Sequence, residues 1–206
     1  MKTDPASRPR LNRAETKEQT RRLLLEAAQR IFLQFGYQGA TLDRIADDAG
    51  FTKGAVYWHF ESKEALFLEL VVDAMRRNSR DLDQLITNLE SAPERLDEVL
   101  GQWLDGVDTR DSLPLLVVEL ELESLRKPSF AVMLNDALVR HEAVIARMIE
   151  RIFEISGRTP PMPTEDLSAS IIRMVEGFAL AGHTRQTSPL TSAKAIKVLL
   201  GMPASS

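Results

Sequence analysis

The sequence predicts an all-α protein, and three observations support this prediction. Apolar residues recur every three to four positions along almost the whole chain, which is the period of a helix with one buried face. No segment shows the strict alternation of apolar and polar residues that a half-buried strand requires. Gly36, Gly50 and the proline-rich stretch 156–163 stand where periodic segments end. We expect about nine helices.

The composition excludes several classes of protein. A chain of 206 residues can bury a substantial core, and without cysteine it can form no disulfide, thiolate zinc site or cysteine nucleophile. The first sixteen residues lack the apolar segment of a secretory signal, and no run approaches the ~20 apolar residues of a membrane span. We therefore expect a soluble, cytoplasmic protein with no membrane partner.

Charge is distributed unevenly along the chain, although the formal net charge is only −4. Residues 1–30 carry eight Lys/Arg against four Asp/Glu, residues 1–62 carry ten against eight, and residues 63–206 carry 16 against 22. The N-terminal third is thus basic at one end and the remainder is acidic. Such asymmetry is compatible with a local nucleic-acid contact.

Three helices are predicted in the first third of the chain. The segment 17–35 carries one apolar stripe that ends before Gly36. Thr41 is a suitable N-cap for a helix of two turns that stops at Gly50, and Thr52 can cap a third short helix. In this third helix we expect Val56 and Phe60 to point inward.

The rest of the chain is predicted to form longer helices. Ser62 can cap a fourth helix that continues to about Leu89. Further helices are expected from Pro93, from Ser112, from Pro128 to the break at 156–163, and over 164–184 and 189–201.

Two short helices joined at a glycine behind a longer helix form the helix-turn-helix pattern, in which the second short helix enters the major groove of DNA. Here that helix covers 52–59. Thr52 and the free N–H groups at its start can bind phosphate, and Lys53 can reach phosphate or a guanine edge. Gly54 and Ala55 reduce bulk where the helix must lie deep.

The cluster Tyr57–Phe60 allows two interpretations. Core packing between helices explains Phe60 fully and Trp58 in large part. Tyr57 and His59, in so short a segment and near two lysines, favour contact with the groove.

The stretch "TLDRIADDAGFTKGAVYWHFESKEAL" resembles the N-terminal signature of the tetracycline-repressor (TetR) family of bacterial transcriptional regulators, and is most similar to its multidrug-efflux regulators. The resemblance covers about residues 17–70. It is carried by these positions: Ala28, Phe35-Gly36, Thr41, Ile45-Ala46, Ala49-Gly50, Gly54, Tyr57, Phe60, Lys63 and Leu66.

The resemblance implies a three-helix DNA-binding head, a long fourth helix, and a helical body that senses a ligand and forms a homodimer through its last two helices. We expect a flexible basic arm over 1–15, the head over 16–62 and the body over 63–206. By position, the residues implied to face DNA are Thr41, Arg44, Thr52, Lys53, Gly54, Ala55, Tyr57, Trp58, His59 and Lys63. The arm either adds phosphate contacts through Arg8, Arg10, Arg13 and Lys17, or is a solvated leader.

Candidate residues in the body follow from helical spacing. A cavity could be lined by Phe67, Val71, Trp103, Met133, His141, Met174 and Phe178, although such residues also suit an ordinary core. His141 lies on an apolar stripe and is either a hydrogen-bonded core residue or a polar anchor in a pocket. The dimer interface is predicted to use Ile171, Val175, Ala179, Ile196, Leu199 and Leu200.

These observations predict a homodimeric transcriptional repressor that binds a pseudo-palindromic operator and is released by a small, largely apolar effector. One alternative is an architectural or division-control DNA-binding protein without an inducer. Another is an all-helical enzyme, which the lack of cysteine, of a phosphate loop and of a paired acid–histidine pattern disfavours. "HEAVI" (141–145) lacks the second histidine of a zinc protease, so no metal or other cofactor is expected.

Overall fold

The computed structural model describes residues 13–104, 113–184 and 191–202. These residues form nine α-helices and one short 3-10 helix, and no strand occurs among them, so the predicted all-α fold is confirmed. The chain divides into two compact units, Met1–Phe67 and Leu68–Ser206. The predicted functional boundary between residues 62 and 63 stays a prediction.

The first unit contains α1 (Arg13–Gly39), α2 (Leu42–Ala49), α3 (Lys53–His59) and the start of α4 (Lys63–Ser91). The regular helix of α1 is interrupted at Gly36, where φ is 66°, so the predicted stop is found inside a helix that resumes for one more turn. Because α1 begins at Arg13, residues 13–15 of the predicted arm belong to this helix. The remainder of the arm lies outside the described residues.

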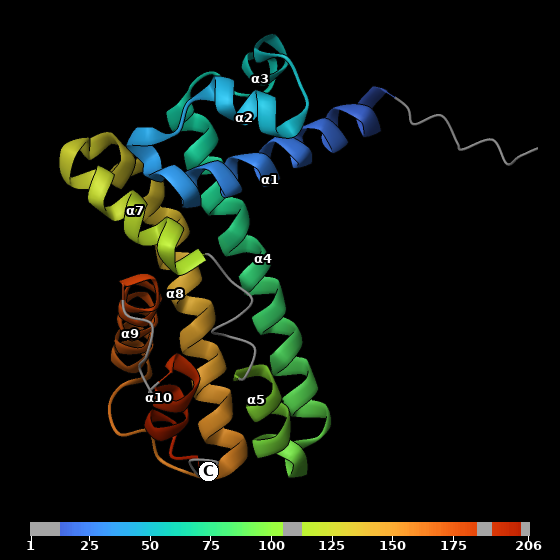
Figure 1. Ribbon diagram of the computed structural model, residues 1–206. Coiled ribbons are helices and arrows are strands. Elements are labelled where there is room, and N and C mark those ends of the chain that lie inside the picture. The colour runs from blue at the N-terminus through green and yellow to red at the C-terminus, as the bar shows by residue number, and fades with distance from the viewer. Residues whose placement is uncertain (1–12, 105–112, 185–190, 203–206) are drawn as a thin grey trace, which may run out of the picture. The chain divides into compact units, whose positions relative to one another are not determined.

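Local capping explains the short helices of this unit. The hydroxyl of Thr41 accepts a hydrogen bond from the N–H of Arg44 at 3.2 Å, and the hydroxyl of Thr52 accepts one from the N–H of Ala55 at 3.2 Å. Gly50 ends α2 with φ 72° and ψ 27°, a left-handed conformation that glycine adopts without steric cost. Figure 1 shows α2 and α3 following one another across this turn.

The core of the first unit is aromatic. Phe67 packs against Phe32 and Tyr37, with ring centroids 4.5 Å and 5.1 Å away. Such tilted ring pairs stabilise a core beyond the area they bury. The other fully buried side chains here include Leu24, Ala27, Ala28, Ile45, Val56 and Leu66.

The second unit contains the rest of α4, then the 3-10 helix η1 (Pro93–Arg95), α5 (Leu96–Leu104), α7 (Leu113–Arg126), α8 (Pro128–Ser156), α9 (Thr164–Thr184) and α10 (Ser192–Leu199). Helices α7, α8 and α9 pack against one another, and α10 packs against α5 and α9. Figure 1 shows α8, in orange, running beside α9. Among the described helices, none has both the length and the apolar character needed to cross a bilayer.

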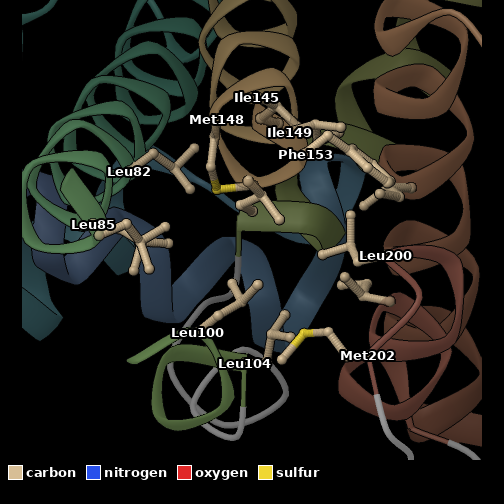
Figure 2. Packing of buried hydrophobic residues seen from close by; sticks show 14 of the residues in the cluster. Leu82, Leu85, Leu100, Leu104, Ile145, Met148, Ile149, Phe153, Leu200 and Met202 are labelled. Atoms are coloured by element: carbon tan, nitrogen blue, oxygen red, sulfur yellow. The ribbon is translucent and has the colours of Figure 1, made fainter. Parts of the chain in front are cut away.

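An apolar cluster in the second unit joins α4, α5, α8, α9 and α10. Leu82 and Leu85 come from α4, Leu100 and Leu104 from α5, and Met148 from α8. Figure 2 shows these side chains converging on a common interior, with Leu200 and Met202 closing it at the C-terminal end. This interior also holds the cavity described below.

Candidate functional site

Helix α3 has one buried face and one exposed face. Val56 is fully buried and Phe60 is 3% exposed, so both anchor the helix in the first unit. Tyr57 and Trp58 are 51% and 66% exposed, and Lys53 and Gly54 are exposed as well. The predicted inward positions, Val56 and Phe60, are therefore confirmed, whereas core packing does not explain Trp58, because most of its side chain is exposed.

The N-terminus of α3 carries a cation that is held in place. The ammonium of Lys53 lies 2.8 Å from Oδ1 and 2.9 Å from Oδ2 of Asp43, the first acidic residue of α2. This hydrogen bond and charge pair raise the pKa of Lys53. Lys53 is therefore charged at neutral pH and is directed along the surface formed by the starts of α2 and α3.

The C-terminus of α3 is held by cations from α1. The Arg21 guanidinium lies 4.9 Å from the ring centroid of Phe60 and donates to the carbonyl oxygen of His59 at 3.3 Å. The ammonium of Lys17 lies 4.8 Å from the centroid of the Trp58 ring. Burial, then Arg21 and Lys17, lower the pKa of His59. The side chain of His59, which is predicted to contact DNA, is half-buried. Because its pKa is lowered, the neutral form of the imidazole is favoured at neutral pH.

The other predicted DNA-facing residues of α2 and α3 are either exposed or half-buried. Thr41, Arg44 and Thr52 are exposed at the helix starts, and Ala55 is half-buried. Arg44 stacks 4.5 Å from the ring centroid of Phe35 and donates to Gly39 O at 3.3 Å. Phe35, placed by its spacing on the buried stripe of the first helix, is exposed, and Phe32 takes the core position.

Lys63, the last of the predicted DNA-facing residues, is turned toward the first unit itself. Its ammonium donates to the carbonyl oxygens of Tyr37 at 2.8 Å and Ala40 at 3.1 Å. It also lies 4.3 Å from the centroid of the Tyr37 ring. The lysine thus satisfies carbonyls at the end of α1, a role that spacing alone does not reveal.

A cavity of about 710 Å³ lies in the second unit, within the size range of small-molecule sites. Of the residues predicted to line it, Trp103 and His141 do so. Phe67 instead belongs to the aromatic core of the first unit, and Val71, Met174 and Phe178 are absent from the lining. The side chain of Met133 lies outside the described residues. These four described residues do not line the cavity, because helical spacing identifies a buried face and not what that face meets; their part in ligand binding stays a prediction.

Several residues predicted for the dimer interface lie around this cavity. Ile171, Val175, Ile196 and Leu200 contribute to its lining, and three of them are buried within the protomer: Ile171, Ile196 and Leu200. Their side chains therefore offer no surface to a second subunit. Ala179 and Leu199 are half-buried.

The polar groups of the cavity were not predicted from sequence, apart from His141. The Nδ1 atom of His141 on α8 lies 3.2 Å from the hydroxyl oxygen of Ser79 on α4, and burial lowers the pKa of this imidazole. Glu176 is only 6% exposed and accepts a hydrogen bond from Arg173 at 2.8 Å. Glu176 sits one turn beyond Ile172 on a largely apolar helix, and its spacing of three residues from Arg173 is the signal that the sequence offers.

The family described as "Bacterial regulatory proteins, tetR family" matches residues 24–70, the segment that includes the two short helices and the start of α4. The HTH-type transcriptional repressor AcnR of Corynebacterium diphtheriae is 35% identical over 164 residues, which cover 77% of this chain and 78% of AcnR. The chain belongs to the TetR family. It is a DNA-binding regulator of transcription and not an enzyme, as predicted.

Solved structures agree with the fold of this TetR-family protein. A transcriptional regulator from Saccharomonospora viridis in complex with choline has a TM-score of 0.62 at 24% identity, over 89% of this chain and 94% of that one. The regulator FadR from Bacillus subtilis in complex with stearoyl-CoA has a TM-score of 0.64 at 16% identity, over 89% and 97%.

Proposed function

We propose that this protein is a homodimeric repressor that places two copies of α3 in successive major grooves of a pseudo-palindromic operator, about 34 Å apart, and that a small molecule in the cavity releases it. The observation that carries the DNA part is the two-faced geometry of α3. Val56 and Phe60 fix the helix, while Lys53, Gly54 and Tyr57 face solvent.

The contacts proposed for DNA follow from this geometry. Thr41, Thr52 and the N–H groups at the starts of α2 and α3 would bind phosphates. Lys53 and Tyr57 would reach base edges or phosphates, with Arg44, Gly54, Ala55 and Trp58 around them. His59 and Lys63 support the helix from behind and would act mainly by positioning it.

The cavity supports the ligand-responsive part of the proposal. Its lining includes residues of α4, and α4 continues into the first unit, so a ligand that prefers one arrangement of α4 would change operator affinity. A coupling of ~1–3 kcal/mol suffices for such a switch. The neighbours that were crystallised with choline and with stearoyl-CoA indicate that this fold accommodates chemically different small molecules.

The homodimer is supported by apolar side chains that the protomer leaves exposed on α7, α8 and α9: Leu122, Leu125, Val132, Val139 and Leu180. Gly177 on α9 is exposed, and nothing lies within 4 Å of where its Cβ would be, so a second helix could approach closely. Val139→Arg and Leu180→Arg should yield monomers in light scattering. Met162→Arg, an exposed change between helices, should leave the dimer intact.

The experiment that tests the function is footprinting of DNA that flanks the gene, with wild type and Tyr57→Ala. Wild type should protect a pseudo-palindrome. Tyr57→Ala should lose roughly tenfold in affinity without a change in thermal stability, because the side chain is exposed. Gln34→Ala, also exposed in the first unit but outside α2 and α3, should bind as wild type. Equal affinity of Tyr57→Ala and wild type would refute the role given to α3.

A further inference from the structure

We propose that the cavity of the second unit takes an amphipathic organic cation and that Glu176 receives the positive charge. This inference rests on the proposed ligand-responsive function and specifies the chemical class of its effector. It follows from which charged groups reach the cavity and from how those groups are already paired.

Carboxylates exceed cations on the side of the cavity formed by α7, α8 and α9. A single guanidinium nitrogen, Nη1 of Arg173, donates to Glu176 at 2.8 Å and to Glu121 at 2.6 Å. Glu142, which also lines the cavity, adds a third negative charge close enough to act on Glu176. One cation thus pairs with two carboxylates while a third lies nearby, and a positive ligand would relieve this imbalance.

Glu176 is the carboxylate best placed to respond to a ligand. It is almost fully buried, and burial is the largest cause of the raised pKa of its carboxyl group; Arg173 opposes this shift, while Glu121 and Glu142 add to it. A buried carboxylate in this state gains most from a further cationic partner, since much of its hydration is already lost.

An anionic ligand would find little to bind in the described part of the lining. The two guanidiniums that reach the cavity are both engaged, Arg77 with Asp73 and Arg173 with two glutamates. His141 adds no positive charge at neutral pH because burial lowers its pKa. Asp81 contributes one more carboxylate to the lining.

The remaining wall suits the apolar part of such a ligand. Trp103 supplies an aromatic ring, which attracts a cation through its face, and aliphatic side chains surround it. Leu82, Leu85, Leu100 and Met148, all visible in Figure 2, belong to this wall. A volume of about 710 Å³ admits a drug-sized molecule.

The test uses phenyl-substituted probes of similar size and different charge on the full-length protein. Tetraphenylphosphonium is the cation, tetraphenylborate the anion and triphenylphosphine oxide the neutral compound. Calorimetry should show that wild type binds the cation about tenfold or more tightly than either of the others. Quenching of Trp103 in a Trp58→Phe background should place the probe in the cavity.

Two variants with the same change of charge make the test specific. Glu176→Gln should lose most of the preference for the cation, whereas Glu94→Gln, at an exposed position outside the cavity lining, should keep it. Circular dichroism checks that both fold. Equal binding of the three probes by wild type, or an unchanged preference in folded Glu176→Gln, would overturn the proposal. Cation binding without release of operator DNA would instead support the proposed ligand class and contradict the proposed switch.

Discussion

Lys63 closes the end of α1 through the backbone of Tyr37: its ammonium donates to the Tyr37 carbonyl at 2.8 Å and lies 4.3 Å from the centroid of the same residue's ring. A second bond, to Ala40 O at 3.1 Å, completes the arrangement. These bonds join the first turn of α4 to the chain that leads into α2. The lysine therefore holds the segment between α1 and α2 against α4.

Lys63→Met should lower the free energy of unfolding of the first unit by about 1–3 kcal/mol, because two partly buried carbonyls lose a charged donor. Chemical denaturation followed by circular dichroism measures this. Loss of operator affinity should follow the loss of folded protein. If the folded variant bound DNA far more weakly at unchanged stability, Lys63 would be a direct phosphate contact instead.

Asp43→Asn should raise operator affinity by about twofold to fivefold at low salt. The substitution frees the Lys53 ammonium and removes a negative charge from the proposed DNA-facing surface. Because the effect is electrostatic, it should shrink as salt increases. Fluorescence anisotropy over a salt series measures it. Asp47→Asn, on the same helix but without a contact to Lys53 in the structure, is the matched control.

Gly50→Ala and Gly54→Ala should affect different properties, the first stability and the second operator affinity. Gly50 has a left-handed backbone, and nothing lies within 4 Å of where its Cβ would be, so alanine there should cost about 1 kcal/mol of stability through the backbone alone. Gly54 has ordinary helical geometry, and its Cβ would lie 3.8 Å from the Thr52 hydroxyl oxygen, so alanine should fold normally. Operator affinity should fall for Gly54→Ala, since the added methyl faces the groove. Thermal melts and anisotropy distinguish the two.

Stability should decrease as pH falls through the ordinary histidine range. Burial lowers the pKa of His141 in the folded state, so protonation favours the unfolded chain. The contribution is fully present above the unfolded pKa of ~6.5 and is lost below it, at up to about 1.4 kcal/mol per pH unit. Denaturation between pH 7.5 and 5 should show a shallower slope for His141→Gln. His59 has a lowered pKa as well, so His59→Gln should remove a separate part of the pH dependence of stability.

Most of the fold follows from local rules that the sequence displays. Thr41, Gly50 and Thr52 specify the ends of α2 and α3 through capping chemistry that depends only on neighbouring residues. The inward positions Val56 and Phe60 follow from helical period. The buried side of α3, and with it the exposed side that we propose to face DNA, could therefore be outlined in advance.

The cavity could not be predicted in the same way. Helical period identifies Ile171 and Ile196 as apolar positions but cannot say whether they meet a second subunit or a hollow interior, because that depends on how distant helices pack. Glu176 illustrates the same limit, since its role comes from Arg173, Glu121 and Glu142 arriving from three helices. Lys63 differs again, because its partners are backbone carbonyls, which leave no trace in residue identities.

The seven residues of α3 are too few to remain helical in isolation. Its helical conformation therefore depends on the side chains that anchor it in the first unit. An excised peptide of this segment should not compete for the operator. Substitutions at the solvent-facing positions 53, 57 and 58 should therefore change DNA binding more than folding. The anchoring positions 56 and 60 must stay apolar. The residues that recognise DNA can therefore change while the residues that hold the helix in place do not.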